Sequence, residues 1–335
     1  MSWPGHARRD AATAGSQRGV ALLTVLLLVA VMAVLVTSVL DDIRFGLRRA
    51  SNAQAMAQAR WHALGAETLA KVRIEHLARA GTRAPPVGEW NGRPLVFPTG
   101  SGLVQARLSD ATTCFNLNSV VEGAPELWQR RDAGARQFHA LLRALGVPDH
   151  RAARLVDALV DWIDADGAPG AQGAEDARYA LRSPGYRTAG TLLAEPSELR
   201  AVEGFDAALY EQLRPHVCAL PTDAPSPTNL NALDDGDAVL LVMLSEGRLS
   251  AQSARQVLRA RPPGGWRDVA DFRRQPLLAA LDLADAALAP LAVQTRFFAL
   301  DVRVEHDGAQ FVSSALFELD AGHARLLARR WTLPE

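Results

Sequence analysis

Residues 20–40 read VALLTVLLLVAVMAVLVTSVL and contain no charged side chain. A helix needs roughly 20 apolar residues to cross a bilayer, and this stretch is long enough. Its hydroxyl side chains, Thr24, Thr37 and Ser38, can bond to the backbone of their own helix. An Asp-Asp pair ends the uncharged run. The sequence therefore predicts a transmembrane helix over residues 20–40.

The segment before this helix is basic and rich in small residues. It carries Arg8, Arg9 and Arg18, followed directly by Gly19. Basic residues beside a first transmembrane helix keep that side of it in the cytoplasm. We therefore expect residues 1–19 to form a cytoplasmic leader and the chain after residue 40 to be exported.

The segment after the apolar run continues the helix. Residues 41–64 read DDIRFGLRRASNAQAMAQARWHAL, without the small-residue cleavage site of a secretory signal peptide. Apolar residues recur at steps of three and four, which predicts an amphipathic continuation over residues 41–80. This apolar stripe needs partner helices, and it consists of Ile43, Leu47, Ala50, Ala53, Ala57, Trp61 and Leu64. The alternative is a plain single-span anchor with a helical stalk.

The remaining chain alternates between strand and helix patterns. Short strand patterns occupy residues 95–97, 103–108, 300–304, 311–319 and 325–332. Helical patterns lie between them, for example at residues 128–145 and 149–164. We therefore expect an α+β protein in which the long helix packs on a small antiparallel sheet. The predicted sheet region comprises residues 81–123 and 291–335, and residues 124–290 form an inserted, all-helical domain.

Composition narrows the range of functions. The formal net charge of the chain is −1, which does not favour a polyanionic partner such as nucleic acid. Its two cysteines, Cys114 and Cys218, both follow the membrane helix. In an oxidising compartment they can form a disulfide, which we predict, although two buried free thiols are the alternative.

The leader and the long helix resemble those of the type IV pilin class. In that class a prepilin peptidase cuts after a glycine, which corresponds here to Gly19, so Val20 begins the mature chain. The class usually has glutamate at the fifth mature position, where this chain has Thr24. An uncharged fifth residue suits a subunit at a filament tip, because no neighbour above it offers an amine. In this feature the chain is similar to the K-type minor pseudopilins of the type II secretion system, which also carry a helical insertion.

This resemblance implies a location, partners and a role. The protein is expected to be a single-pass inner-membrane protein, N-methylated after cleavage, with the bulk of the chain in the periplasm. Expected partners are the I-type and J-type minor pseudopilins, the major pseudopilin, the prepilin peptidase and the inner-membrane assembly platform. The expected role is assembly of the pseudopilus from its tip, for secretion of folded proteins across the outer membrane. The alternative is an unrelated single-span protein with a periplasmic helical binding domain.

An acidic, glycine-rich loop is the one cluster with metal-binding character. Residues 161–176 read DWIDADGAPGAQGAED, and hard cations such as Ca²⁺ prefer oxygen ligands of this kind. The loop is not an EF-hand, because Pro169 occupies the position that requires glycine. Solvated charges are the alternative, but the resembled family is associated with calcium in this domain. The predicted ligands are Asp164, Asp166, Glu175 and Asp176.

Two further function classes receive little support from the sequence. No nucleophile elbow, metalloprotease or phosphate-loop motif is present, so we expect neither an enzyme nor an organic cofactor. Residues 198–217 resemble a helix-hairpin-helix unit, a motif that often binds DNA. Glu198, Glu203 and Asp206 would repel phosphates there, so we expect no nucleic-acid partner. A faint repeat, Asn116-Leu117-Asn118 and Asn229-Leu230-Asn231, opens each half of the helical region.

Overall fold

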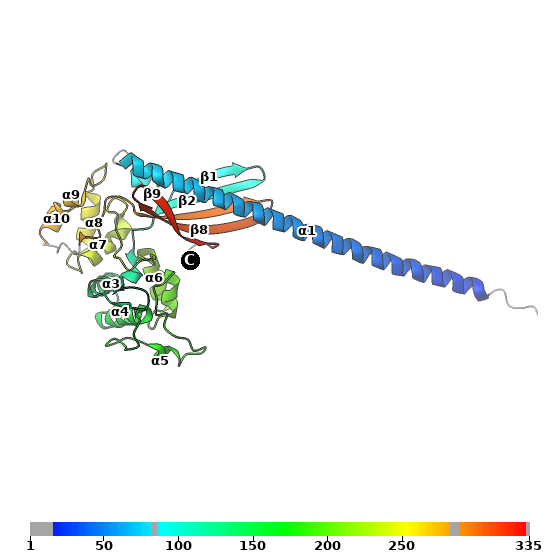
Figure 1. Cartoon of the computed structure of the whole chain (residues 1–335), viewed down its shortest axis with the longest axis horizontal. Helices are drawn as coiled ribbons and strands as arrows, with labels where there is room; N and C mark the ends of the chain where they lie inside the picture. Colours follow the sequence, from blue (N-terminus) through cyan, green and yellow to red (C-terminus); the bar gives the residue numbers. More distant parts are fainter. Residues whose placement is uncertain (1–15, 82–85, 282–287, 333–335) are drawn as a thin grey trace, which may run out of the picture.

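A single helix dominates the computed structural model, which describes residues 16–81, 86–281 and 288–332. Helix α1 (Ser16–Ala80) has 65 residues and is unbroken, so it is about 98 Å long at 1.5 Å per residue. It extends far beyond the rest of the molecule (Figure 1). The predicted continuation of the apolar helix into a long rod is confirmed. Residues 1–15 of the predicted leader lie outside the described residues.

The N-terminal part of α1 has the properties of a membrane anchor. Among the described residues, one helical segment, Gly19–Ala80, is long and apolar enough to cross a bilayer, and its apolar window is fully exposed. Thr24 donates a hydrogen bond to the Ala21 carbonyl at 2.9 Å, and Thr37 donates to that of Ala33 at 3.0 Å. Their hydroxyl groups are thus satisfied within the helix, as a hydrocarbon surrounding requires.

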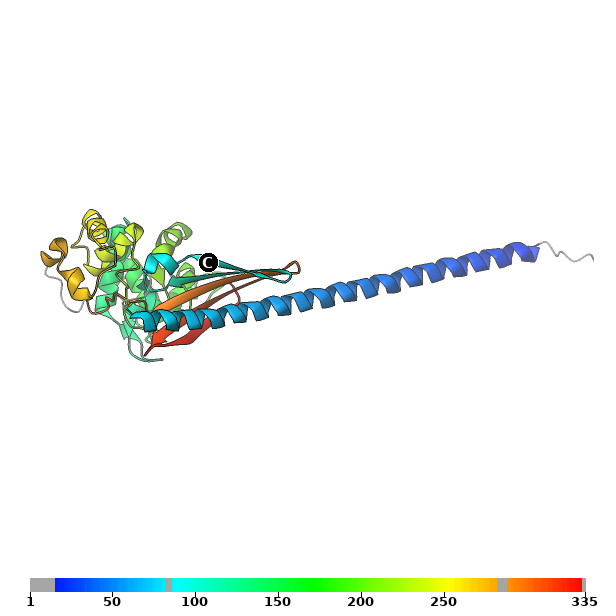
Figure 2. The ribbon, with the colours of Figure 1, turned by 90° about the horizontal axis from the view of Figure 1, so that it is seen from above.

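An antiparallel sheet of five strands lies against the other end of α1 (Figure 2). The strand order is β1-β2-β7-β8-β9, so strands from early and late sequence meet where β2 pairs with β7. The β7–β8 turn has Asp307 at φ 45° and Gly308 at φ 78°, the two positive values that a type I′ hairpin turn requires. The strands are β1 (Pro94–Thr99), β2 (Gly102–Asp110), β7 (Phe297–His306), β8 (Ala309–Asp320) and β9 (His323–Arg330).

Helix α1 meets the sheet through a line of buried residues that we call the alanine line, because five of its seven members are alanine. They recur at helical spacing and are buried, and alanine lets the helix backbone lie close to the strands. Opposite them lie β-branched and aromatic side chains, including Val302, Val304 and Phe317. The buried line on α1 consists of Ala55, Ala59, Ala63, Ala66, Ala70, Ile74 and Leu77.

The helical region between β2 and β7 has a hydrophobic core of its own. Its main helices are α3 (Asp132–Ala144), α4 (Asp149–Ile163), α6 (Ala207–Leu213), α7 (Ala238–Leu244) and α8 (Ala251–Arg259). Its shorter helices are α5 (Asp176–Tyr179), α9 (Val269–Arg273) and α10 (Pro276–Ala279), whereas α2 (Val87–Trp90) lies before β1. The 3₁₀ turns are η2 (Leu117–Val120), η3 (Pro196–Ala201), η4 (Arg214–His216) and η5 (Asp235–Asp237). The fold is therefore mixed α+β, as predicted.

Two details of the predicted helical region are wrong. The region is not helical throughout, because it contains the short strands β5 (Gln129–Arg130) and β6 (Val217–Cys218). They pair with β4 (Val121–Glu122) and β3 (Phe115–Asn116), which precede the predicted helical region. The helix expected from residue 128 begins only at Asp132, because the backbone of β5 pairs with β4.

The helical core also begins earlier in the sequence than expected. Phe115, Leu117 and Val120 are buried in it and not in the sheet core. We therefore propose a domain boundary near residue 111, where β2 has ended, instead of residue 124.

A buried polar cluster lies at the base of the insertion, where the chain leaves β2 and returns to β7. The Asp110 carboxylate accepts hydrogen bonds from Thr112, Asn229 and Thr295. Burial raises the pKa of Asp110, and these hydrogen bonds oppose that rise. Residues more than 180 positions apart are thereby joined.

Candidate functional site

Three of the four predicted metal ligands come together where α4 ends. Each of Asp164, Asp166 and Glu175 offers a carboxylate oxygen, and these atoms all lie within 4.8 Å of one another. Asp164 and Glu175 are each only 8% exposed, whereas Asp166 is exposed. The three carboxylates line an open cavity of about 930 Å³.

The electrostatics of this acidic triad favour a cation. Burial, together with the neighbouring carboxylates, raises the pKa of Asp164 to about 7 and that of Glu175 to about 7. Asp164 Oδ1 and Glu175 Oε1 are buried without a hydrogen-bond partner among the described residues. Such orphaned oxygens are costly unless an ion or water meets them. The cavity is also lined by Arg151, Arg154 and Arg178, but the triad itself offers carboxylate oxygens. Such oxygen ligands suit a hard cation such as Ca²⁺, so the residues of the triad fit the predicted ion.

Asp161 shapes the loop that completes the triad. It lies inside α4, is only 3% exposed, and accepts a hydrogen bond from the Gly170 backbone N–H at 3.1 Å. A Cβ at Gly173 would stand 1.8 Å from Asp161 Oδ2, so a side chain there would push the loop away. Asp161 was not among the predicted ligands. The glycines of the loop are the sequence feature that could have indicated this contact, because glycine lets the backbone come close to another residue.

The fourth predicted ligand, Asp176, lies outside the acidic triad. Its Oδ1 accepts hydrogen bonds from the Thr188 backbone N–H at 2.9 Å and from the Thr188 hydroxyl at 3.0 Å. Arg187 also lies 3.8 Å from its other oxygen. Whether Asp176 contacts an ion stays a prediction.

The Asn-Leu-Asn repeat has a structural role in both halves of the helical region. Asn118 Nδ2 donates to the carbonyls of Leu193 and Leu220, and its Oδ1 accepts from the Leu193 N–H at 2.8 Å. Asn231 makes the same pattern, donating to Trp266 and Val293 and accepting from the Trp266 N–H at 2.7 Å. We call these the two asparagine clamps, since each one joins distant loops of its own half.

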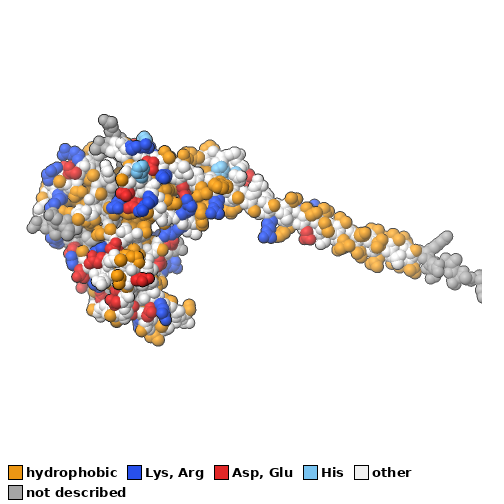
Figure 3. Space-filling view, viewed as in Figure 1, with side chains coloured by type: hydrophobic (Ala, Val, Ile, Leu, Met, Phe, Trp, Pro, Cys, Tyr) orange, Lys and Arg blue, Asp and Glu red, His pale blue; other side chains and the backbone are white. Residues whose placement is uncertain are grey.

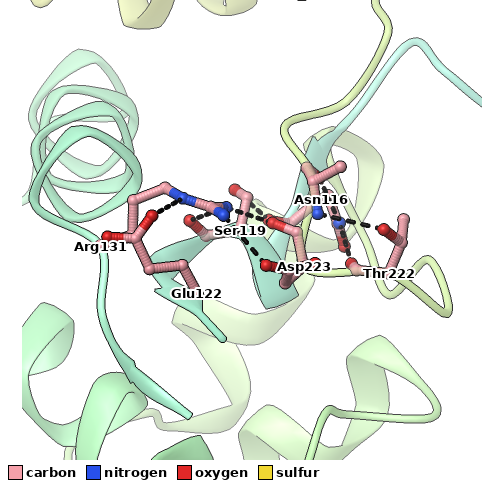
Figure 4. Close-up of polar contacts among 7 residues, drawn as sticks. Asn116, Ser119, Glu122, Arg131, Thr222 and Asp223 are labelled. Carbon is pink, nitrogen blue, oxygen red and sulfur yellow. Dashed lines mark hydrogen bonds and ion pairs between the residues drawn. The ribbon is translucent and has the colours of Figure 1, made fainter. Parts of the chain in front are cut away.

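The segment that connects the two halves, which includes Thr222 and Asp223, is also held by hydrogen bonds and an ion pair. Asn116 Nδ2 donates to the Thr222 carbonyl at 2.7 Å, and Arg131 bonds both the backbone and the carboxylate of Asp223 (Figure 4). Arg131 also reaches Glu122 at 3.1 Å. Close by, Cys114 and Cys218 are joined by a disulfide in the structure, across 104 residues.

The predicted partner stripe on α1 is free of the sheet. Trp61 lies two residues from both Ala59 and Ala63, so about 200° of helix rotation separates it from the buried line. Ile43, Leu47 and Trp61 are 53%, 65% and 69% exposed, and only Leu64 is half-buried. Figure 3 shows hydrophobic side chains on the surface of α1, both in the membrane segment and closer to the sheet. The sequence analysis found this stripe and missed the alanine line on the opposite side.

Comparison with known proteins places the chain in a family. Models described as "Type II secretion system (T2SS), protein K" match residues 113–222 and 228–294, the two halves that the asparagine clamps close. A type II secretion system protein K from Pectobacterium carotovorum subsp. carotovorum is 35% identical over 94% of this chain and 96% of its own length. The chain belongs to the protein K family of the type II secretion system.

Further relatives agree with this assignment. The protein K of Klebsiella pneumoniae is 36% identical over 94% of this chain and 96% of its own length. A chain of the solved GspK-GspI-GspJ complex from enterotoxigenic Escherichia coli is 31% identical, with a TM-score of 0.71. The match covers 85% of this chain and 99% of that one. Members of the protein K family are minor pseudopilins, structural components of the secretion system and not known enzymes.

Membership of the family excludes one alternative that the sequence left open for the whole chain. An unrelated single-span protein is excluded by the matches over most of the chain. In the unit that resembled a DNA-binding hairpin, Asp206 caps α6 and pairs with Arg151 at 2.7 Å, and Glu203 bonds Arg178. These acidic residues therefore have structural partners within the protein K fold.

Proposed function

We propose that this protein K is the tip subunit of the periplasmic pseudopilus, required for pseudopilus assembly and for secretion of folded proteins across the outer membrane. The position of the helical region carries the proposal. It lies at the end of α1 farthest from the membrane segment (Figure 1), where a subunit stacked above would meet it. The bulk between β2 and β7 therefore suits the end of a filament and not its interior.

The features of α1 support the same position. Thr24 is uncharged and bonds its own helix at 2.9 Å, so it leaves no unpaired carboxylate in the bilayer. The exposed stripe from Ile43 to Leu64 is available to the helices of subunits below. The family member in the solved complex is assembled with GspI and GspJ. For this chain we propose the I-type and J-type minor pseudopilins as direct partners, followed by the major pseudopilin.

Processing and orientation complete the proposal. The basic leader keeps the N-terminus in the cytoplasm, prepilin peptidase cuts after Gly19, and the mature chain begins at an N-methylated Val20. A Cβ built at Gly19 meets no atom within 4 Å, so the fold itself does not require glycine there. A need for glycine at this position would come from the peptidase, which must reach the backbone. The assembly platform then receives the chain in the inner membrane.

Photocrosslinking in cells tests the tip position. A benzophenone amino acid is placed at Leu47, Ala50 or Ala57 of the full-length chain, in cells with or without the other minor pseudopilins. We expect crosslinks to other minor pseudopilins and none between two copies of this chain. Abundant self-crosslinks along the filament would contradict the tip position.

A Ca²⁺ ion bound by Asp164, Asp166 and Glu175 is part of the proposed function. It would neutralise the carboxylates and fix the loop after α4 on the surface of the helical region. The support is the pair of buried, unpartnered oxygens in the acidic triad.

A further inference from the structure

A bare stretch of α1 separates the membrane segment from the sheet (Figure 1). Every residue from 41 to 54 is exposed, and Ala55 is the first buried residue of the helix. The bare stretch is about 21 Å long at 1.5 Å per residue. Figure 3 shows acidic and basic side chains on α1 between the apolar membrane segment and the sheet. These charges face the membrane surface and the solvent.

The bare stretch begins among the lipid headgroups. The uncharged run of residues 20–40 is about 31 Å long, close to the roughly 30 Å of the hydrocarbon core. The headgroup layer adds about 5–8 Å on each side. Arg44 lies about 6 Å beyond Leu40, and Arg48 lies about 12 Å beyond it. Helical side chains tilt toward the N-terminus, which here is the membrane side, so these long side chains reach back into the headgroup layer.

The arginines lie on the side of α1 that the partner stripe does not occupy. Arg48 precedes Ala55 by seven residues, or about two helical turns, so it is aligned with the alanine line. Leu47 of the partner stripe lies two residues from both Phe45 and Arg49, so about 200° of helix rotation separates it from each. A helix that packs on the partner stripe therefore leaves Phe45, Arg48 and Arg49 uncovered.

Phe45, Arg48 and Arg49 form an amphipathic surface. Phe45 precedes the two arginines by three and four residues, the spacing of neighbours on adjacent helical turns. It is 69% exposed and lies one turn closer to the membrane. Within the described chain, neither Arg48 nor Arg49 has a hydrogen bond or ion pair through its side chain. Two guanidinium groups suit a phosphate, and the ring beneath them suits the apolar part of a lipid.

Two carboxylates stand closer to the membrane than the arginines. Asp41 pairs with Arg44 at 3.7 Å. Asp42 is exposed, and its side chain has no partner among the residues that the structure describes. It precedes Arg49 by seven residues, so it lies on nearly the same line of the helix, two turns nearer the bilayer. A carboxylate repels a purely anionic headgroup and attracts an ammonium group.

The charges on this side of α1 therefore match a headgroup that contains both a phosphate and an ammonium group. We call Asp42, Phe45, Arg48 and Arg49 the headgroup cluster. We propose that this cluster binds an aminophospholipid of the periplasmic leaflet. Arg48 and Arg49 hold the phosphate, Asp42 holds the ammonium group, and Phe45 packs against the glycerol and acyl region. The bound lipid fixes the depth of α1 in the bilayer. This inference rests on the membrane insertion and orientation given in the proposed function.

Lipid binding to the full-length chain in a nonionic detergent tests the cluster. Native mass spectrometry measures the dissociation constant of the first bound phosphatidylethanolamine, with phosphatidylglycerol and inorganic phosphate as the other probes. We expect phosphatidylethanolamine to bind most tightly. Arg48→Gln with Arg49→Gln should weaken its binding roughly tenfold or more, because two cationic contacts are lost. Asp42→Asn should remove the preference for phosphatidylethanolamine over phosphatidylglycerol.

A matched pair of cations on the same helix serves as the control. Lys71 and Arg73 are exposed and have no side-chain partner in the described part of the chain, but Lys71 lies about 47 Å beyond Leu40. Lys71→Gln with Arg73→Gln should leave lipid binding unchanged. Equal losses in the two double variants would overturn the inference. A wild-type protein that prefers phosphatidylglycerol, or that loses its lipid to inorganic phosphate, would overturn it too.

Photocrosslinking in cells separates this inference from the proposed function. Phe45 and Leu47 are 69% and 65% exposed and about 3 Å apart along the helix axis, but they point to opposite sides. With a benzophenone amino acid at either position, we expect position 45 to capture ³²P-labelled lipid and position 47 to capture minor pseudopilins. If position 45 captures protein as efficiently as position 47, the headgroup cluster is wrong and the proposed function stands. If position 45 captures lipid and position 47 captures no minor pseudopilin, the inference stands and the proposed partners fail.

Discussion

The two halves of the helical region, residues 113–222 and 228–294, are closed in the same way but differ in what they carry. Each begins with Asn-Leu-Asn, and the second asparagine of each motif clamps two distant loops. Only the first half contains the acidic triad and the disulfide that joins Cys114 to Cys218. The clamp is therefore the shared structural element, and the charged loop is an addition to it.

The difference has an energetic consequence. Asn118 is fully buried and satisfies its hydrogen bonds within the protein, so its clamp stabilises the first half on its own. The acidic triad instead gathers like charges that burial penalises. The first half should thus depend on its covalent link and on a cation, whereas the second should depend on neither.

Removal of the disulfide should have the largest effect. Cys114→Ala with Cys218→Ala frees a loop of 104 residues, and the loop-entropy model gives a loss of about 4–5 kcal/mol in the free energy of unfolding. Urea denaturation of the periplasmic part of the chain measures it. Reductant should destabilise the wild-type protein similarly and leave the double variant unaffected. Two alkylatable thiols in protein from the periplasm would contradict the predicted bridge.

The first clamp should have the next largest effect, and the second clamp should contribute less. Asn118→Ala leaves three buried backbone groups without partners, which costs about 4 kcal/mol. Asn231→Ala should cost about 2 kcal/mol, because Asn231 is only half-buried and water can replace some of its bonds. The same denaturation experiment measures both, with the exposed Asn52→Ala as the control. Equal, small effects at positions 118 and 231 would show that the clamps do not hold the halves together.

Calcium binding should stabilise the first half and not the second, by less than the first clamp does. At a concentration 100 times its dissociation constant, a cation that binds only the folded protein stabilises it by about 2.7 kcal/mol. Asp164→Ala with Glu175→Ala should abolish this rise in melting temperature, and without calcium the variant should be at least as stable as wild type. Asp235→Ala with Glu246→Ala, in the second half, should keep the response. An unchanged wild-type melting temperature with calcium or with chelator would exclude the site.

The pH dependence of the calcium-free protein should show the smallest effect. The pKa of Asp164 and of Glu175 is about 7 in the folded protein, against ordinary values of 3.8 and 4.5. The folded state then binds more protons than the unfolded state between about pH 4 and pH 7, so stability falls as pH rises through this window. Melting curves of wild type and of the Asp164→Ala, Glu175→Ala variant should diverge there. Parallel curves would show that the two carboxylates titrate normally.

Local patterns determined much of this protein in advance. The uncharged run of residues 20–40 and the helical spacing after it suffice for α1, because helix formation depends on neighbours three and four residues away. Asp307-Gly308 specifies its hairpin for an equally local reason, since its turn needs two positive φ values. The Arg18-Gly19-Val20 motif and Thr24 likewise indicated the family from adjacent residues.

Contacts between distant residues were decided only by the tertiary structure. The apolar stripe and the alanine line both have helical spacing, so the sequence alone did not indicate which one would face the sheet. The packing selects alanine because its small side chain lets the helix approach the strands closely. Asp161 bonds the backbone of the loop, whereas Asp176 bonds the backbone of Thr188, outside the acidic triad. A pattern in the sequence does not reveal hydrogen bonds to backbone groups of this kind. Residue spacing along the chain thus determined the elements, and three-dimensional packing decided which of their faces and side chains meet.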